Sequence, residues 1–311
     1  MSGSDMEREE FRREAVAGLT SMPKGLPGKF LWDETGSRIF DRICDEPDYY
    51  PTRCEAALLP EAIREVAALV GPGATVVEYG SGASRKVRSL LDALDRPARY
   101  VAVDISREYL EASVQRLAGD YPSVVMTPVC ADYAKPIRLP LSCSDGPVLG
   151  FFPGSSIGNF APSDAEGLLA RMRDTLGSSR LLIGADPTLD EMQLRMAYGR
   201  SGGLMRAFHL NILHRMNREL GADFDLSDFR HEARILRNPF RVEAHLVASQ
   251  AKTYRVDGTE IRFEAGESVR TDTSHKYEPA AFRALAERGG WTSERIWLDH
   301  DQRFSLHLLS A

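Results

Sequence analysis

The chain has 311 residues, of which 43% are hydrophobic and 27% charged, as in a globular protein of one large domain or two. Its net charge of -6 leaves no basic excess for binding nucleic acid or an anionic membrane surface. No apolar run approaches the roughly 18 residues of a membrane span, and the polar segment "MSGSDMEREEFRREAVAG" lacks the apolar region of a signal peptide. We expect a cytoplasmic, monomeric protein whose partner is a small molecule.

The first part of the chain is predicted to be helical with one interruption. Residues 8–22 read as an amphipathic helix, and prolines and glycines make a loop of "MPKGLPGKFLWDETGS". Helices are expected again in "SRIFDRICDEP", ended by Pro47, and in "RCEAALLPEAIREVAALV" despite Pro60.

The middle of the chain alternates between short apolar runs and amphipathic segments. Strands are predicted at 74–79, 99–103, 123–129, 147–152 and 179–184, with helices at 85–94, 107–118 and 163–175. This alternation predicts an α/β fold with a doubly wound, Rossmann-like parallel sheet covered by helices on both faces. A closing helix (279–289) and two strands (293–299 and 303–309) are expected to complete the sheet as an antiparallel hairpin.

The pattern changes after residue 186. One long helix is predicted over 191–221, and 241–256 and 259–274 read as an antiparallel pair joined near Asp257 and Gly258. We expect two domains: a core of 55–189 and 277–311, and a smaller α+β substrate-binding domain of 8–54 and 190–276.

A glycine turn follows the first strand of the core. The sequence Gly80-Ser-Gly82 presents backbone N–H groups to a ligand, but Arg85 stands where a dinucleotide-binding fingerprint has its third glycine. Glu78 near the end of the strand would repel a pyrophosphate and suits a cationic ligand. These two features disfavour a nicotinamide dehydrogenase.

Two further acids are predicted at successive strand ends. Asp104 ends the second strand, where a ribose diol is usually held, and Asp132 in "VCADY" follows the third, placed to accept a hydrogen bond from an adenine amine. S-adenosylmethionine carries an ammonium, a sulfonium and a ribose but no phosphate, so we predict it as the cofactor. The alternative is that the glycines only make a turn and the acids are exposed strand ends.

Other candidate residues are less specific. Asn159 in "FFPGSSIGNF" suits an amino-acid carboxylate, although a helix cap is the alternative. The tyrosines of "DYYPTRCE" are equally typical of a core. His209 and His214 are poorly spaced for a shared ligand face, and the four cysteines lack a CxxC spacing, so no metal site is predicted.

Several motifs, in order over residues 20–309, make the chain resemble the histidine Nα-methyltransferases of ergothioneine biosynthesis. They include "IFDRICDEPDYYPTRCEAALL", "VVEYGSGASRKVRSLLDAL", "FFPGSSIGNF", "FHLNILHRMNRELGADFDL" and "WLDHDQRFSLHLL". The YYPTR and GSSIGN motifs and the NRELGADFDL run are specific to that family, whereas the glycine turn is shared by many methyltransferases.

The resemblance implies a role for each matching position. By this resemblance, Asn159 and Tyr198 bind the carboxylate of the amino acid, and Gly154 lies near its amine. Its ring is contacted by Tyr49, Asp272 and Ser274. Cofactor contacts are assigned to Gly80, Lys86, Asp104, Asp132 and Tyr133, beside Glu78 and Gly82 from the turn.

The sequence departs from the family at four places. Trp32 replaces a tyrosine near the amine, Ala244 a methionine and Asp272 a glutamate, and "AYGR" stands where "AYDD" is usual. The second and third changes enlarge the ring end of the pocket, at a cost of about 2–5 kcal/mol if nothing refills it. Histidine is the expected substrate. A larger aromatic amino acid such as tryptophan or a modified tryptophan is the alternative.

Methyl transfer needs no catalytic nucleophile. The protein must hold an unprotonated amine about 3–3.5 Å from the methyl group, and it must disfavour the ammonium. Trp32, unlike tyrosine, cannot accept a proton. Repeated methylation, up to a trimethylated, hercynine-type product, would need an aromatic hollow, which we expect from Trp32, Tyr49 and Phe152. A non-catalytic protein that binds the cofactor or an amino acid is the alternative from another class.

Overall fold

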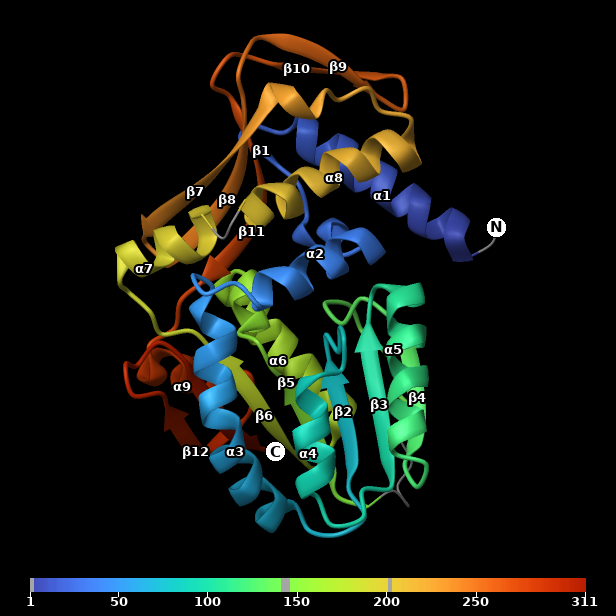
Figure 1. Cartoon of the computed structure of the whole chain (residues 1–311), viewed down its shortest axis with the longest axis vertical. Helices are drawn as coiled ribbons and strands as arrows, with labels where there is room; N and C mark the ends of the chain where they lie inside the picture. Colours follow the sequence, from blue (N-terminus) through green and yellow to red (C-terminus); the bar gives the residue numbers. More distant parts are fainter. Residues whose placement is uncertain (1–2, 141–145, 201–202) are drawn as a thin grey trace. The chain divides into compact units, whose positions relative to one another are not determined.

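The computed structural model describes residues 3–140, 146–200 and 203–311 (Figure 1). The chain forms two compact units: Met1–Tyr49 with Asp190–Ser274, and Tyr50–Leu189 with His275–Ala311. We call them the smaller and the larger unit. Cys143, one of the four cysteines considered for metal binding, lies outside the described residues.

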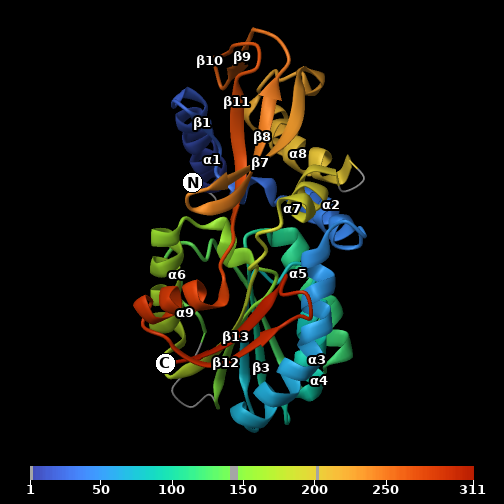
Figure 2. The same cartoon turned by 90° about the vertical axis from the view of Figure 1, so that its left-hand side faces the viewer.

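The larger unit is built on a seven-stranded sheet in the order β12-β13-β6-β5-β2-β3-β4. Its parallel strands are β2 (Thr75–Tyr79), β3 (Arg99–Asp104), β4 (Val125–Cys130), β5 (Val148–Phe152) and β6 (Ser179–Ala185). Strands β12 (Thr292–Leu298) and β13 (Ser305–Ser310) form an antiparallel hairpin (Figure 2), and β13 also pairs with β6. The predicted fold class, including the closing hairpin, is confirmed.

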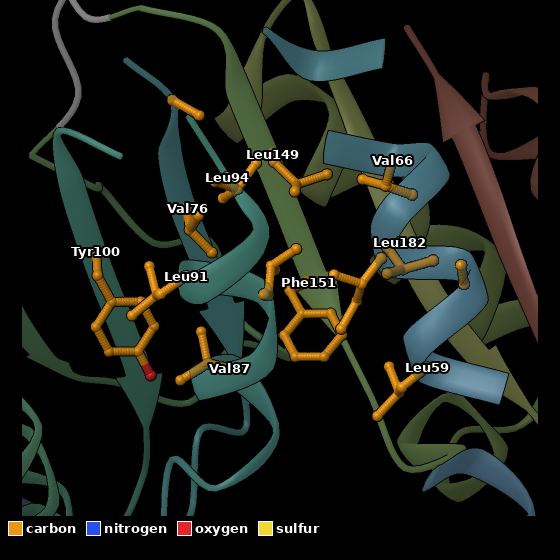
Figure 3. Packing of buried hydrophobic residues seen from close by; sticks show 14 of the residues in the cluster. Leu59, Val66, Val76, Val87, Leu91, Leu94, Tyr100, Leu149, Phe151 and Leu182 are labelled. Carbon is orange, nitrogen blue, oxygen red and sulfur yellow. The ribbon is translucent and has the colours of Figure 1, made fainter. Parts of the chain in front are cut away.

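Alternating side chains of the strands build two buried layers. Val76 and Phe151 belong to the layer on one face of the sheet, and Val77 and Phe152 to the layer on the other. The first layer is covered by α3 (Tyr50–Val70), α4 (Lys86–Ala93) and α5 (Arg107–Asp120), the second by α6 (Pro162–Leu176) and α9 (Pro279–Arg288). Figure 3 shows Phe151 among aliphatic side chains of the first layer. Each large apolar side chain buried in this way stabilises the fold by about 1.5–3 kcal/mol.

The strand order reverses at β2. The chain runs from β2 outward to β3 and β4, then returns to the other side of β2 with β5 and β6. In open sheets of this kind, ligands bind outside the carboxyl ends of the strands where the order reverses. The loops that follow β2 and β5 are therefore the parts of the larger unit expected to hold a ligand.

The smaller unit contains a four-stranded sheet in the order β1-β11-β8-β7 and a separate hairpin of β9 and β10. Its strands are β1 (Lys24–Gly25), β7 (Phe229–Arg237), β8 (Phe240–Ala248), β9 (Lys252–Val256), β10 (Thr259–Phe263) and β11 (Ser268–His275). The region predicted as a loop around residue 25 contributes β1 and the 3₁₀ helix η1 (Gly28–Leu31). Helices α1 (Gly3–Thr20) and α2 (Glu34–Cys44) flank it in sequence.

Two predictions for the smaller unit are wrong in detail. The expected single helix over 191–221 is divided into α7 (Glu191–Arg195), the π-helical turn η3 (Met196–Arg200) and α8 (Leu204–Leu220), because Gly203 adopts a left-handed conformation with φ +82°. The expected antiparallel pair is four strands. Asp257 and Gly258, both with positive φ, join β9 to β10 as predicted, but β8 and β11 belong to the other sheet.

The chain passes between the units after residues 49, 189 and 274. Two of these points differ from the expected boundaries at 54/55 and 276/277, and a buried hydrogen-bond cluster explains the difference. Tyr50 Oη and Lys276 Nζ each donate to Oδ2 of Asp186, at 2.6 Å, so both residues are tied to the end of β6.

No helix among the described residues is long and apolar enough to cross a membrane.

Candidate functional site

The glycine turn after β2 is fixed to the neighbouring strand. Gly80 and Gly82 have φ of +69° and +49°, which favour glycine because a Cβ would be strained there. Gly80 N donates to the carbonyl of Val103 (2.8 Å), and Gly82 N donates to Asp104 Oδ2 (2.9 Å). The structure therefore brings together three of the residues predicted to bind the cofactor.

The acids at the ends of β3 and β4 both cap the turns that follow these strands. Asp104 Oδ1 accepts a hydrogen bond from Ser106 N at 3.0 Å, and Asp132 Oδ1 accepts one from Ala134 N at 3.0 Å. Burial raises the pKa of Asp104, and the backbone N–H groups that it accepts oppose this shift. These carboxylates are held in fixed orientations by backbone donors.

Glu78 is 1% exposed and lies in a hydrogen-bonded chain. Tyr100 Oη donates to Glu78 Oε2 (2.5 Å), and Ser84 Oγ lies 3.3 Å from the same tyrosine oxygen. Burial raises the pKa of Glu78 to about 8, against the opposing effects of the Tyr100 hydrogen bond and the Lys86 charge. A bound cation would favour the charged form of this carboxyl. Tyr100 was not predicted, because nothing in "RPARYVAVD" distinguishes it from a core aromatic residue.

Tyr133, predicted to lie beside the adenine, belongs to a group of aromatic rings. Its ring centroid lies 5.4 Å from that of Phe152, 6.2 Å from that of Phe160 and 6.3 Å from that of Tyr79. Phe152 is fully buried in this group. As the last residue of β5, Phe152 belongs to the buried core layer, and its expected contribution to an aromatic hollow at the amine stays a prediction.

Unpartnered polar atoms collect at the same edge of the sheet. Buried side-chain atoms with no hydrogen-bond partner in the described part of the larger unit include Tyr79 Oη, Ser81 Oγ, Ser106 Oγ and Ser155 Oγ. These four residues end β2 or lie in the loops after β2, β3 and β5. Because buried polar groups are normally hydrogen-bonded, their concentration here fits a binding edge for a polar ligand. The glycine turn after β2 and the acids at the strand ends fit a polar ligand that is also cationic.

The loop after β5 adopts an uncommon conformation. Gly154 and Ser155 have φ of +80° and +59°, and the 3₁₀ helix η2 (Ser156–Asn159) follows. Gly154 N donates to Oε1 of Glu55 at 2.8 Å. The exposed Asn159 ends η2, and the carbonyl of Gly158 lies 3.1 Å from Nδ1 of His275. Glu55 was missed, although it closes the "YYPTRCE" motif.

In the smaller unit, aromatic rings connect the predicted substrate residues. Ring centroids of Trp32 and Phe40 lie 4.9 Å apart, those of Phe40 and Tyr49 5.9 Å, and those of Tyr49 and Tyr198 6.1 Å. Tyr198 Oη lies 3.3 Å from Ser274 Oγ. Tyr198 stands in the π-helical turn η3, a type of turn that occurs frequently at functional sites.

Ala244 and Asp272 lie on the adjacent strands β8 and β11. Thr271 Oγ1 donates to the carbonyl of Ala244 at 3.3 Å. Asp272 Oδ1 accepts from Thr273 N and lies 2.8 Å from the point that a Cβ on Gly28 would occupy. The Asp272 side chain therefore packs directly on η1. In residues 3–140, 146–200 and 203–311, no group of three or more His, Cys, Asp or Glu side chains is placed to hold a metal ion.

A Rossmann-like sheet closed by an antiparallel hairpin, with a glycine turn after β2, is the fold expected of an S-adenosylmethionine-dependent methyltransferase. The family model of the histidine-specific, S-adenosylmethionine-dependent methyltransferases matches residues 11–311. The chain belongs to this family and is an S-adenosylmethionine-dependent methyltransferase.

Curated relatives match almost the whole chain. A histidine N-alpha-methyltransferase of Mycolicibacterium smegmatis is 37% identical and one of Mycobacterium tuberculosis 36% identical, each over 98% of this chain and 96% of its own length. The N-methyltransferase dtpB of Aspergillus flavus is 28% identical over 97% of this chain and 88% of its own length.

Proposed function

We propose that the protein methylates the α-amino group of free L-histidine, up to the trimethylated, hercynine-type product of ergothioneine biosynthesis. Histidine is chosen as the substrate because the hydroxyls of Tyr198 and Ser274 lie 3.3 Å apart and next to the ring of Tyr49. These positions suit a small polar ring and a carboxylate, and the similarity to named histidine methyltransferases supports the same substrate.

The larger unit is proposed to hold the cofactor. S-adenosylmethionine supplies a methyl group on a sulfonium, and its transfer breaks the carbon–sulfur bond, forms a carbon–nitrogen bond and leaves S-adenosylhomocysteine. Glu78 offers a carboxyl to the cationic end, Asp104 to the ribose and Asp132 to the adenine amine, with Tyr133 beside the adenine ring. Gly80 and Gly82 let the backbone approach, and Lys86 begins the helix after the turn.

The residues assigned to the amino acid act by orientation. Asn159 and Tyr198 are proposed to bind the carboxylate, and Gly154 to lie by the amine. A fixed carboxylate restricts the direction of the amine, which contributes to the rate without a catalytic nucleophile. The indole of Trp32 cannot accept the proton that the amine must lose, so we expect this proton to pass to water or to be lost before binding.

A larger aromatic substrate, such as tryptophan, is the second candidate. Ala244 stands directly across from Ala233 in the pairing of β8 with β7, so at the position where the family has a methionine one methyl side chain lies beside another. This small pair leaves more volume for a substrate ring than a methionine would. Asp272, one methylene shorter than glutamate, favours the same candidate.

The test is a methylation assay with each of the free amino acids in turn and S-adenosylmethionine carrying a labelled methyl group. We expect labelled histidine with mass increases of one to three methyl groups on the α-nitrogen. A product labelled on a ring atom, with a free α-amine, would disprove the proposed arrangement. Preferential labelling of tryptophan would replace histidine by the second candidate.

A cytoplasmic location and a monomeric state remain predictions from the sequence. Light scattering coupled to size-exclusion chromatography tests the second, with a mass of 34.5 kDa expected for one chain.

A further inference from the structure

One buried carboxylate contacts both loops that border the reversal of strand order. Glu55, in the first turns of α3, is 0% exposed. Its Oε1 accepts the N–H of Gly154 at 2.8 Å, and its Oε2 accepts a hydrogen bond from the ammonium of Lys86. All three residues belong to the larger unit, and a single side chain thus joins three segments that are distant in sequence.

The two partners of Glu55 occupy equivalent places on neighbouring strands. Lys86 is the first residue of α4, just after the glycine turn that follows β2, and Gly154 lies just after β5. β2 and β5 are hydrogen-bonded to each other, and the strand order reverses between them. Ligands in such sheets bind at this place, so Glu55 holds together the two loops that form it.

The loop after β5 depends on external support. Gly154 and Ser155 are successive residues with left-handed backbone conformations, and the second of them carries a side chain, which makes the conformation uncommon. The charged acceptor on Gly154 N fixes the peptide that enters this turn. A Cβ on Gly154 would stand 3.2 Å from Lys86 Nζ, so the ammonium borders the loop directly as well.

We propose that Glu55 is a positioning residue that couples the two ligand sites by holding these loops in one register. It acts through Lys86 on the cofactor loop and through the Gly154 amide on the loop assigned to the amino acid. A change at either loop alters the geometry of the shared carboxylate, so binding at one affects binding at the other, and the coupling is reciprocal. This inference rests on the proposed function for the identity of the second ligand.

Three variants test the proposal. Glu55→Ala removes both contacts. Glu55→Gln keeps an oxygen for Gly154 N–H but turns an amide NH₂ toward Lys86, which cannot pair with it. Glu65→Gln is the matched control, because Glu65 lies on the same helix and accepts from Trp297 Nε1 at 3.4 Å, away from both loops.

Calorimetry gives the dissociation constant of the amino acid with and without saturating S-adenosylhomocysteine. We expect S-adenosylhomocysteine to tighten amino-acid binding to the unaltered protein by about 5–150-fold, the usual range of such coupling. The ratio of the two dissociation constants, without and with S-adenosylhomocysteine, should fall to nearly one in Glu55→Ala and stay unchanged in Glu65→Gln. In Glu55→Gln it should lie between these two values.

A purely structural role would lower both affinities and leave the ratio at its original value, and that result would overturn the proposal. A ratio of one in the unaltered protein would overturn it too. If the thermal midpoint shows that Glu55→Ala does not fold, Glu55→Gln decides by the same ratio. The amino acid used is the one that the unaltered protein methylates, so rejection of histidine disproves the proposed substrate and leaves the test of Glu55 intact.

Discussion

The ammonium of Lys276 lies 2.6 Å from Oδ2 of Asp186, and both side chains are fully buried. Tyr50 Oη donates to the same oxygen at 2.6 Å, while Thr188 N donates to Oδ1 at 2.9 Å. Tyr50, Asp186 and Lys276 each lie within a few residues of a point where the chain passes between the two units. The cluster therefore anchors all three connections to the larger unit.

Removal of one charge from this cluster should destabilise the larger unit strongly. Asp186→Asn leaves the Lys276 ammonium buried without its counter-charge, at an expected cost of about 3–5 kcal/mol. Tyr50→Phe removes the hydrogen bond to Asp186 and should cost about 1 kcal/mol. Urea unfolding followed by tryptophan fluorescence gives these differences, since Trp291 and Trp297 lie in this unit. The double variant Asp186→Asn, Lys276→Met should recover part of the loss, and simple additivity would contradict the coupling.

The stability of the ligand-free protein should fall as the pH rises from about 4.5 to about 8 because of Glu78. The pKa of this carboxyl is raised by burial to about 8 in the folded chain, against an ordinary value of 4.5. Between these values the folded state binds more protons than the unfolded state, so the free energy of unfolding decreases with pH and levels off above 8. Glu78→Gln should remove this part of the pH dependence, as measured by urea unfolding at several pH values. If the free energy of unfolding of Glu78→Gln fell with pH as steeply as that of the unaltered protein, this role of Glu78 would be contradicted.

The same shift predicts proton release when the cofactor binds. A cation beside Glu78 lowers the pKa of the carboxyl, so at neutral pH the binding of S-adenosylmethionine should expel a proton. Calorimetric titrations in two buffers of different ionisation enthalpy measure the number of protons released. We expect a positive number for the unaltered protein and a smaller one for Glu78→Gln.

Substitutions in the proposed carboxylate clamp should separate the two ligands. Asn159→Ala and Tyr198→Phe each remove one hydrogen bond to a charged group, worth about 1.5–3 kcal/mol, so the amino-acid KM should rise about 10-fold or more. The dissociation constant of S-adenosylhomocysteine should be unchanged. Tyr121→Phe, which only removes hydrogen bonds from Tyr121 Oη to Asp92 and the Arg88 carbonyl, is the matched control. Equal losses for both ligands would argue against the clamp.

Trp32→Tyr should move the pH optimum of the reaction. The indole packs on Phe40 and Phe208, with ring centroids 4.9 and 5.2 Å away, and it has no proton acceptor. Without a side chain that takes the proton, the reaction should need a more alkaline solution to supply free amine. We expect the optimum of the variant at lower pH than that of the unaltered protein. Superimposable profiles of kcat/KM against pH would refute this role of Trp32.

The larger unit shows what local sequence patterns reveal. The apolar runs at 74–79 and 99–103 and the amphipathic segments between them predicted β2, β3 and the helices, because hydrophobic periodicity follows directly from the geometry of each element. The glycine turn and the acids at strand ends were visible for the same reason, since their spacing is set by one strand and the turn after it. In the smaller unit, the helix break at Gly203 was missed. The partition of the strands into two sheets was missed as well, because strand partners are chosen by long-range packing.

The sequence by itself determined the order of elements in the larger unit, the class of fold and the acids at the ends of its strands. Only the tertiary structure decided which buried charges meet. Glu55 is 31 positions from Lys86 and 99 from Gly154, and Asp186 is 90 positions from Lys276. A buried carboxylate must find its donors wherever the fold places them, since an unpaired one is too costly to keep away from water. No local pattern carries that information, because the partners are neighbours in space alone.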